Sequence, residues 1–326
     1  MKLIEFDRFG GPEVLQLREG PEPQLRLDDL LVRNHSAGVN RADLTLRRGG
    51  YGRPDFGDSE TMGLEIAGEV IALGAEVHGF GLGDRVMGIV GGGGYAELSR
   101  IDHRMAMRVP EGLNYVQAAA IPECFVTAHE ALVHLARIQP GESVLIHAAA
   151  SGVGTAAIQL AHAIGTKIYA TADASKLPAL RDLGADVLIP YKTEDYAQRI
   201  SDETNQSGVN VIVDFIGAPN FDRNINSLAG GGRLIQVGLM AGLEGANLPL
   251  SRLVHSNLQI IGTIMKSRPQ PEKYAMVQRF AKTWLPQLAE GTLKPVIDSV
   301  FPLSQAADAH RRMEQNLNSG KIILTA

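Results

Sequence analysis

The segment from Val144 to Ala157 constrains the fold of this 326-residue chain more than any other part of it. It reads VLIHAAASGVGTAA, so a short apolar run leads into a glycine-containing turn and then into small and apolar residues at helical spacing. An apolar run of this length bounded by a turn is typical of a buried strand. The order of strand, glycine turn and helix predicts a dinucleotide-binding turn that opens a parallel α/β sheet.

The composition of this turn supports that prediction. Gly152 and Gly154 lack a Cβ, so the backbone can approach a pyrophosphate closely. The following helix offers free N–H groups at the positive end of its dipole. An ordinary tight turn between a strand and a helix is the alternative, and the pattern of the next hundred residues argues against it.

Strands and helices alternate from this turn onward. The predicted strands cover residues 143–147, 167–171, 186–189, 209–214, 233–237 and 258–262. The helical stretches between them cover residues 153–164, 175–183, 193–204, 220–228 and 250–256. Six strands joined by five helical crossovers predict a doubly wound parallel sheet, because parallel neighbours need such crossovers.

The two ends of the chain follow another pattern. Short extended runs separated by turn signals predict an antiparallel β domain, and they cover residues 30–32, 69–73, 84–87 and 95–98. The last sixty residues are too few to fold alone, and they are predicted to hold helices at 271–290 and 304–316 and strands at 299–303 and 321–324. We therefore expect one domain from residues 1–122 and 267–326, interrupted by a nucleotide-binding domain at 123–266.

Charge and cysteine content narrow the function classes. The 31 basic and 36 acidic residues give a net charge of −5, and aromatic residues make up 5% of the chain, which disfavours a nucleic-acid platform or an anionic membrane surface. The single cysteine, Cys124, allows neither an internal disulfide nor a cysteine-cluster zinc site. Acidic residues near the N-terminus stand where a signal peptide needs its apolar run. We expect a soluble cytoplasmic protein.

The end of the second predicted strand bears on the choice between NAD and NADP. Thr171 occupies the position where an acidic residue selects the ribose of NAD, and Asp173 follows two residues later. The charge of Lys176 favours the 2′-phosphate of NADP, whereas Asp173 repels it. Tyr191, after the third strand, can supply a hydroxyl to the same phosphate. The residues leave both cofactors open.

Six motifs in the right order resemble those of the medium-chain dehydrogenases/reductases. They are AGVNRAD (37–43), GLEIAGEV (63–70), GDRV (83–86), AAAIP (118–122), AHRRME (309–314) and GKIIL (320–324). Within that superfamily the chain looks like the zinc-free quinone oxidoreductase group that includes zeta-crystallin, closest to the apoptosis-associated, NADPH-dependent branch. The resemblance implies a GroES-like β-barrel catalytic domain and a Rossmann domain with a six-stranded parallel sheet.

The resemblance also implies that no metal is bound. Zinc-dependent members place a cysteine where this chain has Asn40 and a histidine where it has Leu64. Glu65 remains from that motif and Cys124 lies near the sequence position of another ligand, but two residues do not make a tetrahedral site.

The family's site residues carry over onto specific positions. For the pyrophosphate turn they are Ala150, Ser151, Gly152, Val153 and Gly154, with Ser151 in place of the middle glycine. Thr171 is added at the end of the next strand, and Lys176 and Tyr191 are implied as contacts of the 2′-phosphate. The cofactor's other flank is implied to be Gly238, Leu239, Met240, Ile264, Met265, Lys266 and Asn316. Around the nicotinamide the resemblance points to Asn40, Asp43, Tyr51 and Thr127.

The implied activity is hydride transfer from NADPH to a small quinone, with Tyr51 and Asn40 as hydrogen-bond donors to the reduced quinone. Asn40 and Asp43 would alternatively cap a short helix, and Thr127 would bond within one. Reduction of enones or enoyl thioesters is the rival activity, in which basic residues bind an anionic or CoA-linked substrate: Arg41, Arg47, Arg48 and Arg53. A protein that binds NADPH or nucleic acid with little catalysis is the rival of another class. The resemblance places the apolar run 258–263 at the edge of the nucleotide-binding sheet, where it would pair two copies into a homodimer.

Overall fold

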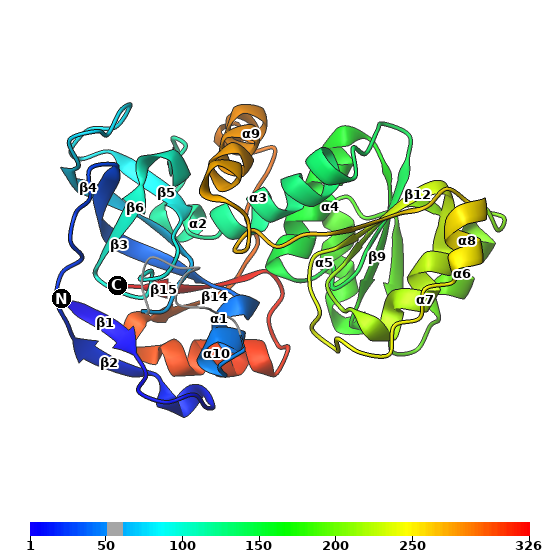
Figure 1. Ribbon diagram of the computed structural model, residues 1–326, viewed down its shortest axis with the longest axis horizontal. Helices are drawn as coiled ribbons and strands as arrows, with labels where there is room; N and C mark the ends of the chain where they lie inside the picture. Colours follow the sequence, from blue (N-terminus) through cyan, green and yellow to red (C-terminus); the bar gives the residue numbers. More distant parts are fainter. Residues whose placement is uncertain (51–60) are drawn as a thin grey trace. The chain divides into compact units, whose positions relative to one another are not determined.

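The computed structural model describes residues 1–50 and 61–326. The chain forms two compact units (Figure 1). The first unit comprises Met1–Val126 and Lys266–Ala326, and the second comprises Thr127–Met265. The division after Val126 falls four residues later than the sequence suggests, inside the helix α3 (Pro122–His129), which continues as a π-helical segment over Glu130–Leu135.

The first unit is built on a mainly antiparallel sheet. Its strands, in the order β14-β15-β3-β4-β5-β7, are Ile297–Pro302, Lys321–Thr325, Asp29–Val39, Glu65–Leu73, Arg85–Ile89 and Ala106–Arg108. The long strand β3 also pairs with β6 (Leu98–Asp102), and β1 (Lys2–Glu5) pairs with β2 (Gln16–Glu19). The helices of this unit are α1 (Arg41–Arg47), α2 (Tyr115–Ala118), α9 (Gln270–Ala289) and α10 (Ala306–Glu314).

Two details of the first unit differ from the sequence prediction. The strand predicted at 95–98 begins only at Leu98, because Tyr95 donates its N–H to the Met62 carbonyl and lies outside the ladder that pairs residues 98–102 with β3. Strands β14 and β15 run parallel to one another, with α10 as the crossover between them, so the sheet is not wholly antiparallel.

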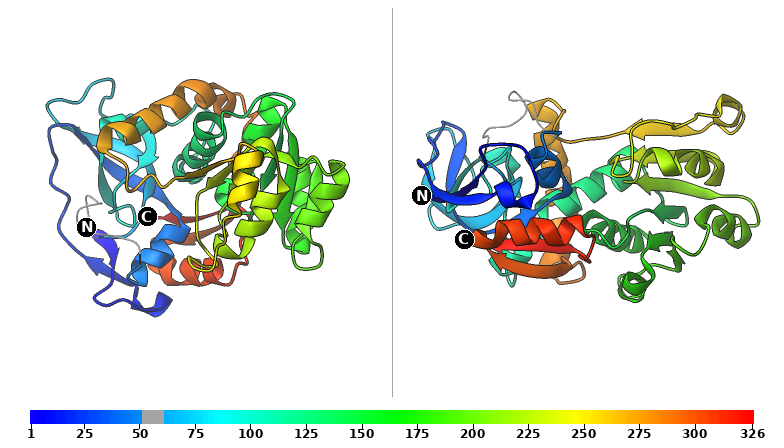
Figure 2. Two further views of the ribbon diagram at one scale, coloured as in Figure 1. Left: turned by 45° about the vertical axis from the view of Figure 1, so that its right-hand side comes forward. Right: turned by 90° about the horizontal axis from the view of Figure 1, so that it is seen from below.

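The second unit is a six-stranded, entirely parallel sheet, as predicted. Its strands, in the order β10-β9-β8-β11-β12-β13, are Val187–Pro190, Lys167–Ala172, Ser143–Ile146, Val209–Asp214, Leu228–Gln236 and Gln259–Gly262. The crossovers contain α4 (Gly152–Ile164), α5 (Leu177–Asp182), α6 (Tyr196–Glu203), α7 (Ala218–Ser227) and α8 (Leu250–His255). The first strand in the sequence, β8, lies in the middle of the sheet. Strands β9 and β10 are added on one side of β8, and β11, β12 and β13 on the other. Figure 2 gives two further views of this arrangement.

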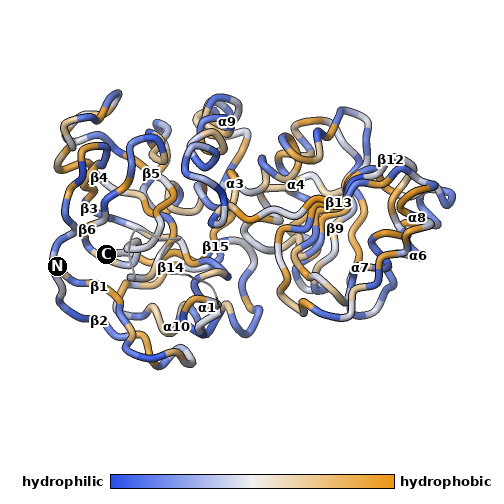
Figure 3. Tube along the Cα trace, viewed as in Figure 1, coloured by the Kyte–Doolittle hydropathy of each residue, from blue (hydrophilic) through white to orange (hydrophobic). Residues whose placement is uncertain are grey.

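The core of the second unit explains why these strands form. Val144, Leu145 and Ile146 of β8 are fully buried, and Figure 3 shows the apolar character of the sheet's strands. A run that is apolar on both faces is stable as a central parallel strand because helices cover both sides of the sheet. Helix α4 ends at Gly165, whose φ of 87° terminates the helix in the left-handed conformation.

Within the described residues, no helix is both long enough and apolar enough to cross a membrane.

Candidate active site

The glycine turn links β8 to α4. Ser151 caps the helix: its Oγ accepts the Gly154 N–H at 3.0 Å, and its carbonyl accepts the Thr155 N–H at 2.8 Å. A Cβ on Gly154 would lie 2.6 Å from the carbonyl oxygens of both Ala148 and Ala149, so this position requires glycine. The serine that replaces the family's middle glycine therefore has a local structural role as a helix cap.

The same turn keeps hydrogen-bond donors available. Within the described part of the chain, the N–H groups of Gly152 and Val153 have no acceptor, and they stand at the N-terminus of a 13-residue helix. The Ser151 hydroxyl accepts the cap bond and keeps its own proton. Ala150 is buried and contributes backbone only. This set of donors fits a pyrophosphate, so four of the predicted residues, 151–154, come together in a suitable arrangement.

Thr171 connects this turn to the next strand through its backbone. Its carbonyl accepts the Ala149 N–H at 3.0 Å. Its hydroxyl is buried and bonds the Nδ1 atom of His147 at 2.9 Å, while His147 Nε2 bonds Asn224 Oδ1 at 2.8 Å. Since the amide oxygen accepts, Nε2 carries the proton and Nδ1 accepts the Thr171 hydroxyl proton. Burial lowers the pKa of His147, in agreement with a neutral ring. Thr171 thus supports the turn, and its hydroxyl proton is already used.

Charged residues follow the ends of β9 and β10. Asp173 comes directly after β9, Lys176 ends the short 3₁₀ turn Ala174–Lys176, and Lys192 follows β10. Lys192 Nζ lies 2.6 Å from Asp173 Oδ2. Tyr191 follows β10 and is exposed. Its N–H donates to the carbonyl of Ala172, the last residue of β9, at 3.3 Å. Three of these residues are predicted from the sequence, and Lys192 is not.

The segments predicted along the cofactor's other flank follow β12 and β13. Gly238 packs against the backbone of Phe215, since a Cβ would lie 3.0 Å from the Phe215 carbonyl oxygen. Leu239, Met240 and Ile264 are exposed large apolar side chains in the second unit. Met265 ends the second unit, and Lys266 belongs to the first, where partial burial lowers the pKa of its ammonium.

A buried charged cluster in the first unit contains Asn40. We call it the Lys321 cluster and define it as Val39, Asn40, Glu65, Glu123 and Lys321. The Lys321 ammonium donates to the Val39 carbonyl at 2.9 Å, to Asn40 Oδ1 at 2.8 Å and to the Glu65 carboxylate, which uses all three of its protons. Glu65 also accepts from Asn40 Nδ2 and from the Glu123 N–H, each at 2.9 Å.

The Lys321 cluster fixes the Asn40 amide. Its oxygen faces the ammonium, and its two N–H groups bond Glu65 at 2.9 Å and the Gly38 carbonyl at 3.3 Å. Asn40 is half-buried, whereas Glu65 and Lys321 are almost fully buried. The amide therefore has no spare proton, and it can donate to a substrate only by giving up one of these bonds.

A second polar network surrounds Asp43. Its carboxylate accepts the Asn40 N–H at 2.8 Å, so Asn40 and Asp43 do cap α1, as the structural alternative expected. The Tyr95 hydroxyl donates to Asp43 at 2.9 Å and bonds His310 Nε2 at 3.2 Å, and Arg47 bonds His310 Nδ1 at 3.1 Å. A guanidinium only donates, so His310 Nδ1 accepts and Nε2–H points at Tyr95.

Burial is the largest cause of the pKa shifts of Asp43 and His310 in this network, and also of those of Glu123 and Cys124. It raises the pKa of Asp43 to about 6 and lowers that of His310 to about 3. Burial together with the neighbouring Glu65 carboxylate raises the pKa of Glu123 to about 8, and burial raises that of the Cys124 thiol to about 12. Near neutral pH, His310 is therefore neutral and the Cys124 thiol is protonated.

The remaining predicted residues have separate positions. Tyr51 lies outside the described residues. Thr127 is half-buried in α3 and begins the second unit. Asn316 follows α10, and its Oδ1 accepts from Arg41 at 2.7 Å, which places it beside the start of α1. Sequence analysis missed Tyr95, His310 and Lys321, although a lysine in the otherwise apolar strand KIILT is a signal of a buried partner.

The residues at the former zinc positions do not fit a zinc ion. The Asn40 oxygen and the Glu65 carboxylate are both bonded to the Lys321 ammonium. Zn²⁺ prefers thiolate, imidazole and free carboxylate ligands. Within residues 1–50 and 61–326, no group of three or more His, Cys, Asp or Glu side chains is arranged to hold a metal ion.

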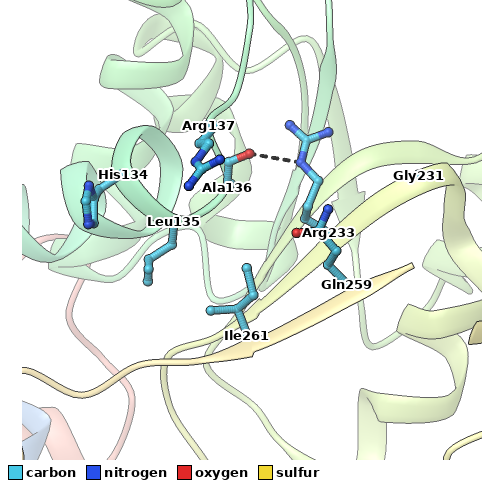
Figure 4. A pocket seen from close by; sticks show the side chains of 8 residues that line it. All are labelled: His134, Leu135, Ala136, Arg137, Gly231, Arg233, Gln259 and Ile261. Atoms are coloured by element: carbon cyan, nitrogen blue, oxygen red, sulfur yellow. Dashed lines mark hydrogen bonds between the residues drawn. The ribbon is translucent and has the colours of Figure 1, made fainter. Parts of the chain in front are cut away.

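A pocket of about 430 Å³ lies at another part of the second unit (Figure 4). Gly231, Arg233, Gln259 and Ile261 line it from β12 and the edge strand β13, together with residues 134–137. The Arg233 guanidinium is held by Glu142 at 2.7 Å and by the Ala136 carbonyl at 2.9 Å. Because the glycine turn follows the carboxyl end of β8 and this pocket includes the first residue of β13, it is separate from the predicted cofactor site.

Two protein-family models match the chain. The model described as alcohol dehydrogenase GroES-like domain matches residues 26–111, and the one described as zinc-binding dehydrogenase matches residues 152–282. The chain is 33% identical to a quinone oxidoreductase of Homo sapiens and 34% identical to that of Rattus norvegicus. These alignments cover 99% of this chain and 97% of each relative.

Solved structures agree with these matches. The Escherichia coli quinone oxidoreductase complexed with NADPH superposes with a TM-score of 0.91 at 28% identity, covering both chains completely. The Pseudomonas syringae quinone oxidoreductase gives a TM-score of 0.90 at 30% identity and covers 100% of this chain and 99% of that one.

Proposed function

Because this chain belongs to the medium-chain dehydrogenase/reductase family, with quinone oxidoreductases as full-length relatives, we propose that it transfers hydride from NADPH to small quinones without zinc. The observation that carries this proposal is the Ser151-capped turn, where the N–H groups of Gly152 and Val153 at the start of α4 bond no acceptor among the described residues. The relatives supply the substrate class.

The proposed mechanism asks little chemistry of the protein itself. NADPH, when bound, supplies the hydride. The residues 151–154 bind its pyrophosphate, and the segments 238–240 and 264–266 are proposed to flank it. Thr127 and Asp43 are proposed to lie around the nicotinamide. Asp43 acts there by fixing the start of α1, and with it the position of Asn40.

Hydride addition leaves a hydroquinone anion that needs a hydrogen-bond donor and then a proton. We propose Tyr51 as that donor. Asn40 contributes a second bond if its amide exchanges the 3.3 Å bond to the Gly38 carbonyl, the longer of its two donated bonds, for one to the substrate. The Lys321 cluster keeps the amide oriented during this exchange, since its oxygen remains bonded to the ammonium.

The Lys321 cluster also supports zinc independence. Its ammonium uses the Asn40 and Glu65 oxygens that a metal would need, and a buried positive charge repels a second cation.

The position of Arg47 argues against a role for this residue in the enoyl-thioester alternative. Arg47 is fully buried and pairs with Glu314, Arg48 pairs with the same carboxylate, and Arg41 bonds Asn316. Arg47 is therefore neither on a solvated basic face nor available to a CoA phosphate. Arg53 lies outside the described residues.

We also propose that the protein is a homodimer that pairs through β13. This strand is at the edge of the sheet, and Ile260 and Ile261 are only half-buried there. An unpaired edge with apolar side chains favours pairing with a second copy. In that dimer the partner would cover the pocket of Figure 4, which Ile261 lines.

Steady-state oxidation of NADPH and NADH, in the presence of chelator, tests the proposed activity. The acceptors are 1,4-benzoquinone, 9,10-phenanthrenequinone and crotonyl-CoA. We expect turnover of the quinones, faster with NADPH, and none of crotonyl-CoA. Reduction of crotonyl-CoA in preference to both quinones would establish the alkene-reductase alternative. Binding of both cofactors without turnover of any acceptor would establish the non-catalytic one.

A further inference from the structure

The ends of β9 and β10 bring two opposite charges together beside the glycine turn. These strands are parallel neighbours, and their register pairs Ala172 with Pro190. Asp173 directly follows Ala172, and Lys192 lies two residues beyond Pro190. Strand β9 also pairs with β8, whose carboxyl end leads into the turn. All these residues therefore lie at the carboxyl ends of the parallel strands, where a dinucleotide binds in this kind of fold.

Both carboxylate oxygens of Asp173 accept hydrogen bonds in this arrangement. One carboxylate oxygen accepts the Lys192 ammonium at 2.6 Å. The other accepts the Ser175 N–H at 3.2 Å and the Ser175 hydroxyl at 2.9 Å, which caps the short 3₁₀ turn. The Lys192 bond and the Ser175 bonds lower the pKa of Asp173 to about 2, so the carboxylate is ionised at all working pH values.

Lys192 is not fully engaged. Its side chain is 64% exposed, and in the described part of the chain its ammonium has Asp173 as its one partner. An ammonium carries three protons, so two remain for another acceptor. The charges of Asp173, Lys176 and Lys192 add up to one net positive charge at the carboxyl ends of β9 and β10. A positive charge suits a phosphate better than a ribose hydroxyl.

We propose that Lys192 determines cofactor specificity: its ammonium neutralises Asp173 and is also a cationic contact of the 2′-phosphate of NADPH. This inference rests on the proposed NADPH-dependent function. It resolves the conflict that Asp173 poses in the sequence. An unpaired Asp173 would repel the phosphate and accept the ribose hydroxyls of NADH. Paired with Lys192 and Ser175, it does neither.

Two nucleotide probes that differ only in the 2′-phosphate test this inference. They are adenosine 2′,5′-bisphosphate and adenosine 5′-monophosphate, titrated calorimetrically at low salt into the full-length protein and its variants. We expect wild type to prefer the bisphosphate. The variant K192M should bind the bisphosphate about tenfold more weakly, because one charge-assisted contact is lost and Asp173 is freed to repel it, with the monophosphate changed less than about threefold.

Two further variants serve as controls. Lys167 lies at the other end of β9, is similarly exposed and pairs with Asp186 at 3.7 Å, so K167M removes a matched surface ion pair away from the edge. We expect it to bind both probes like wild type. The variant D173N should keep or increase the preference for the bisphosphate, because it removes the repulsive charge and leaves Lys192 in place. An unchanged preference in K192M, or a loss shared equally by both probes or by K167M, would overturn the inference.

The probes contain no nicotinamide, so their binding is independent of turnover. If wild type does not oxidise NADPH with any quinone but K192M loses the preference, the proposed activity fails and the Lys192 assignment stands. If wild type is an active quinone reductase but does not prefer the bisphosphate, the Lys192 assignment fails and quinone reduction stands. For an active enzyme, K192M should also raise the KM for NADPH and leave kcat unchanged.

Discussion

Replacing Lys321 by methionine tests the buried charge balance of the first unit. Methionine keeps much of the side-chain volume and removes the ammonium. The Glu65 carboxylate would then keep its bonds from Asn40 and Glu123 and lose the counter-charge that Lys321 provides. Removing one partner of a buried ion pair costs about 3–5 kcal/mol. We expect K321M to lose that much unfolding free energy.

The single tryptophan of the chain provides the assay. Trp284 is buried in α9 of the first unit, so its fluorescence during urea unfolding reports on the unit that contains the Lys321 cluster. The double variant E65Q/K321M should recover a large part of the loss, because it removes both charges. Lys2 is an exposed lysine of the same unit, and K2M should change stability by less than about 0.5 kcal/mol. A loss below about 1 kcal/mol in K321M, or no recovery in the double variant, would refute the reasoning.

Three other predictions concern the turn, the Asp43 network and the sheet edge. G154V places side-chain atoms against two carbonyl oxygens of the turn. It should weaken NADPH binding by about tenfold or more in a fluorescence titration. Unchanged affinity would show that the turn is not the cofactor site. Burial raises the pKa of Asp43 from 3.8 to about 6, so wild type should lose on the order of 3 kcal/mol of unfolding free energy relative to D43N as the pH rises from about 4 to 7. A constant difference in urea unfolding would contradict that burial cost. I261K adds a charge to the edge strand β13 at a residue that lines the pocket, and it should convert the proposed dimer of about 70 kDa, twice the 35.0 kDa chain, to a monomer in light scattering. A dimer that persists in I261K would show that it pairs elsewhere.

Local patterns predicted the second unit well. The signals for its buried strands, its glycine turn and its helices each lie within a few contiguous residues. All six predicted strands are present, in the predicted order along the chain. The unit boundary is harder to predict because α3 runs across it without a break in composition. The parallel pairing of β14 with β15 is likewise invisible in either strand alone.

The Lys321 cluster and the Asp43 network could not be predicted from the sequence. Lys321 and Glu65 are 256 residues apart in the chain, and His310 lies 215 residues from Tyr95. No spacing rule connects such residues. The family motifs identified Asn40 and Asp43, but only their contacts show that Asp43 caps α1 and that the Asn40 amide has no free proton. Lys192 was missed because its significance depends on its pairing with Asp173 across two strands.

The central claim is zinc-free hydride transfer from NADPH to a quinone, and one anaerobic stopped-flow measurement tests it most directly. Protein dialysed against chelator, with its zinc content measured, is mixed with NADPH and then with 1,4-benzoquinone while the nicotinamide absorbance is followed. NADPH deuterated at C4 serves as the comparison. We predict rapid single-turnover oxidation in zinc-free protein that slows with the deuterated cofactor. Oxidation no faster than without protein, or oxidation that requires added zinc, would contradict the claim.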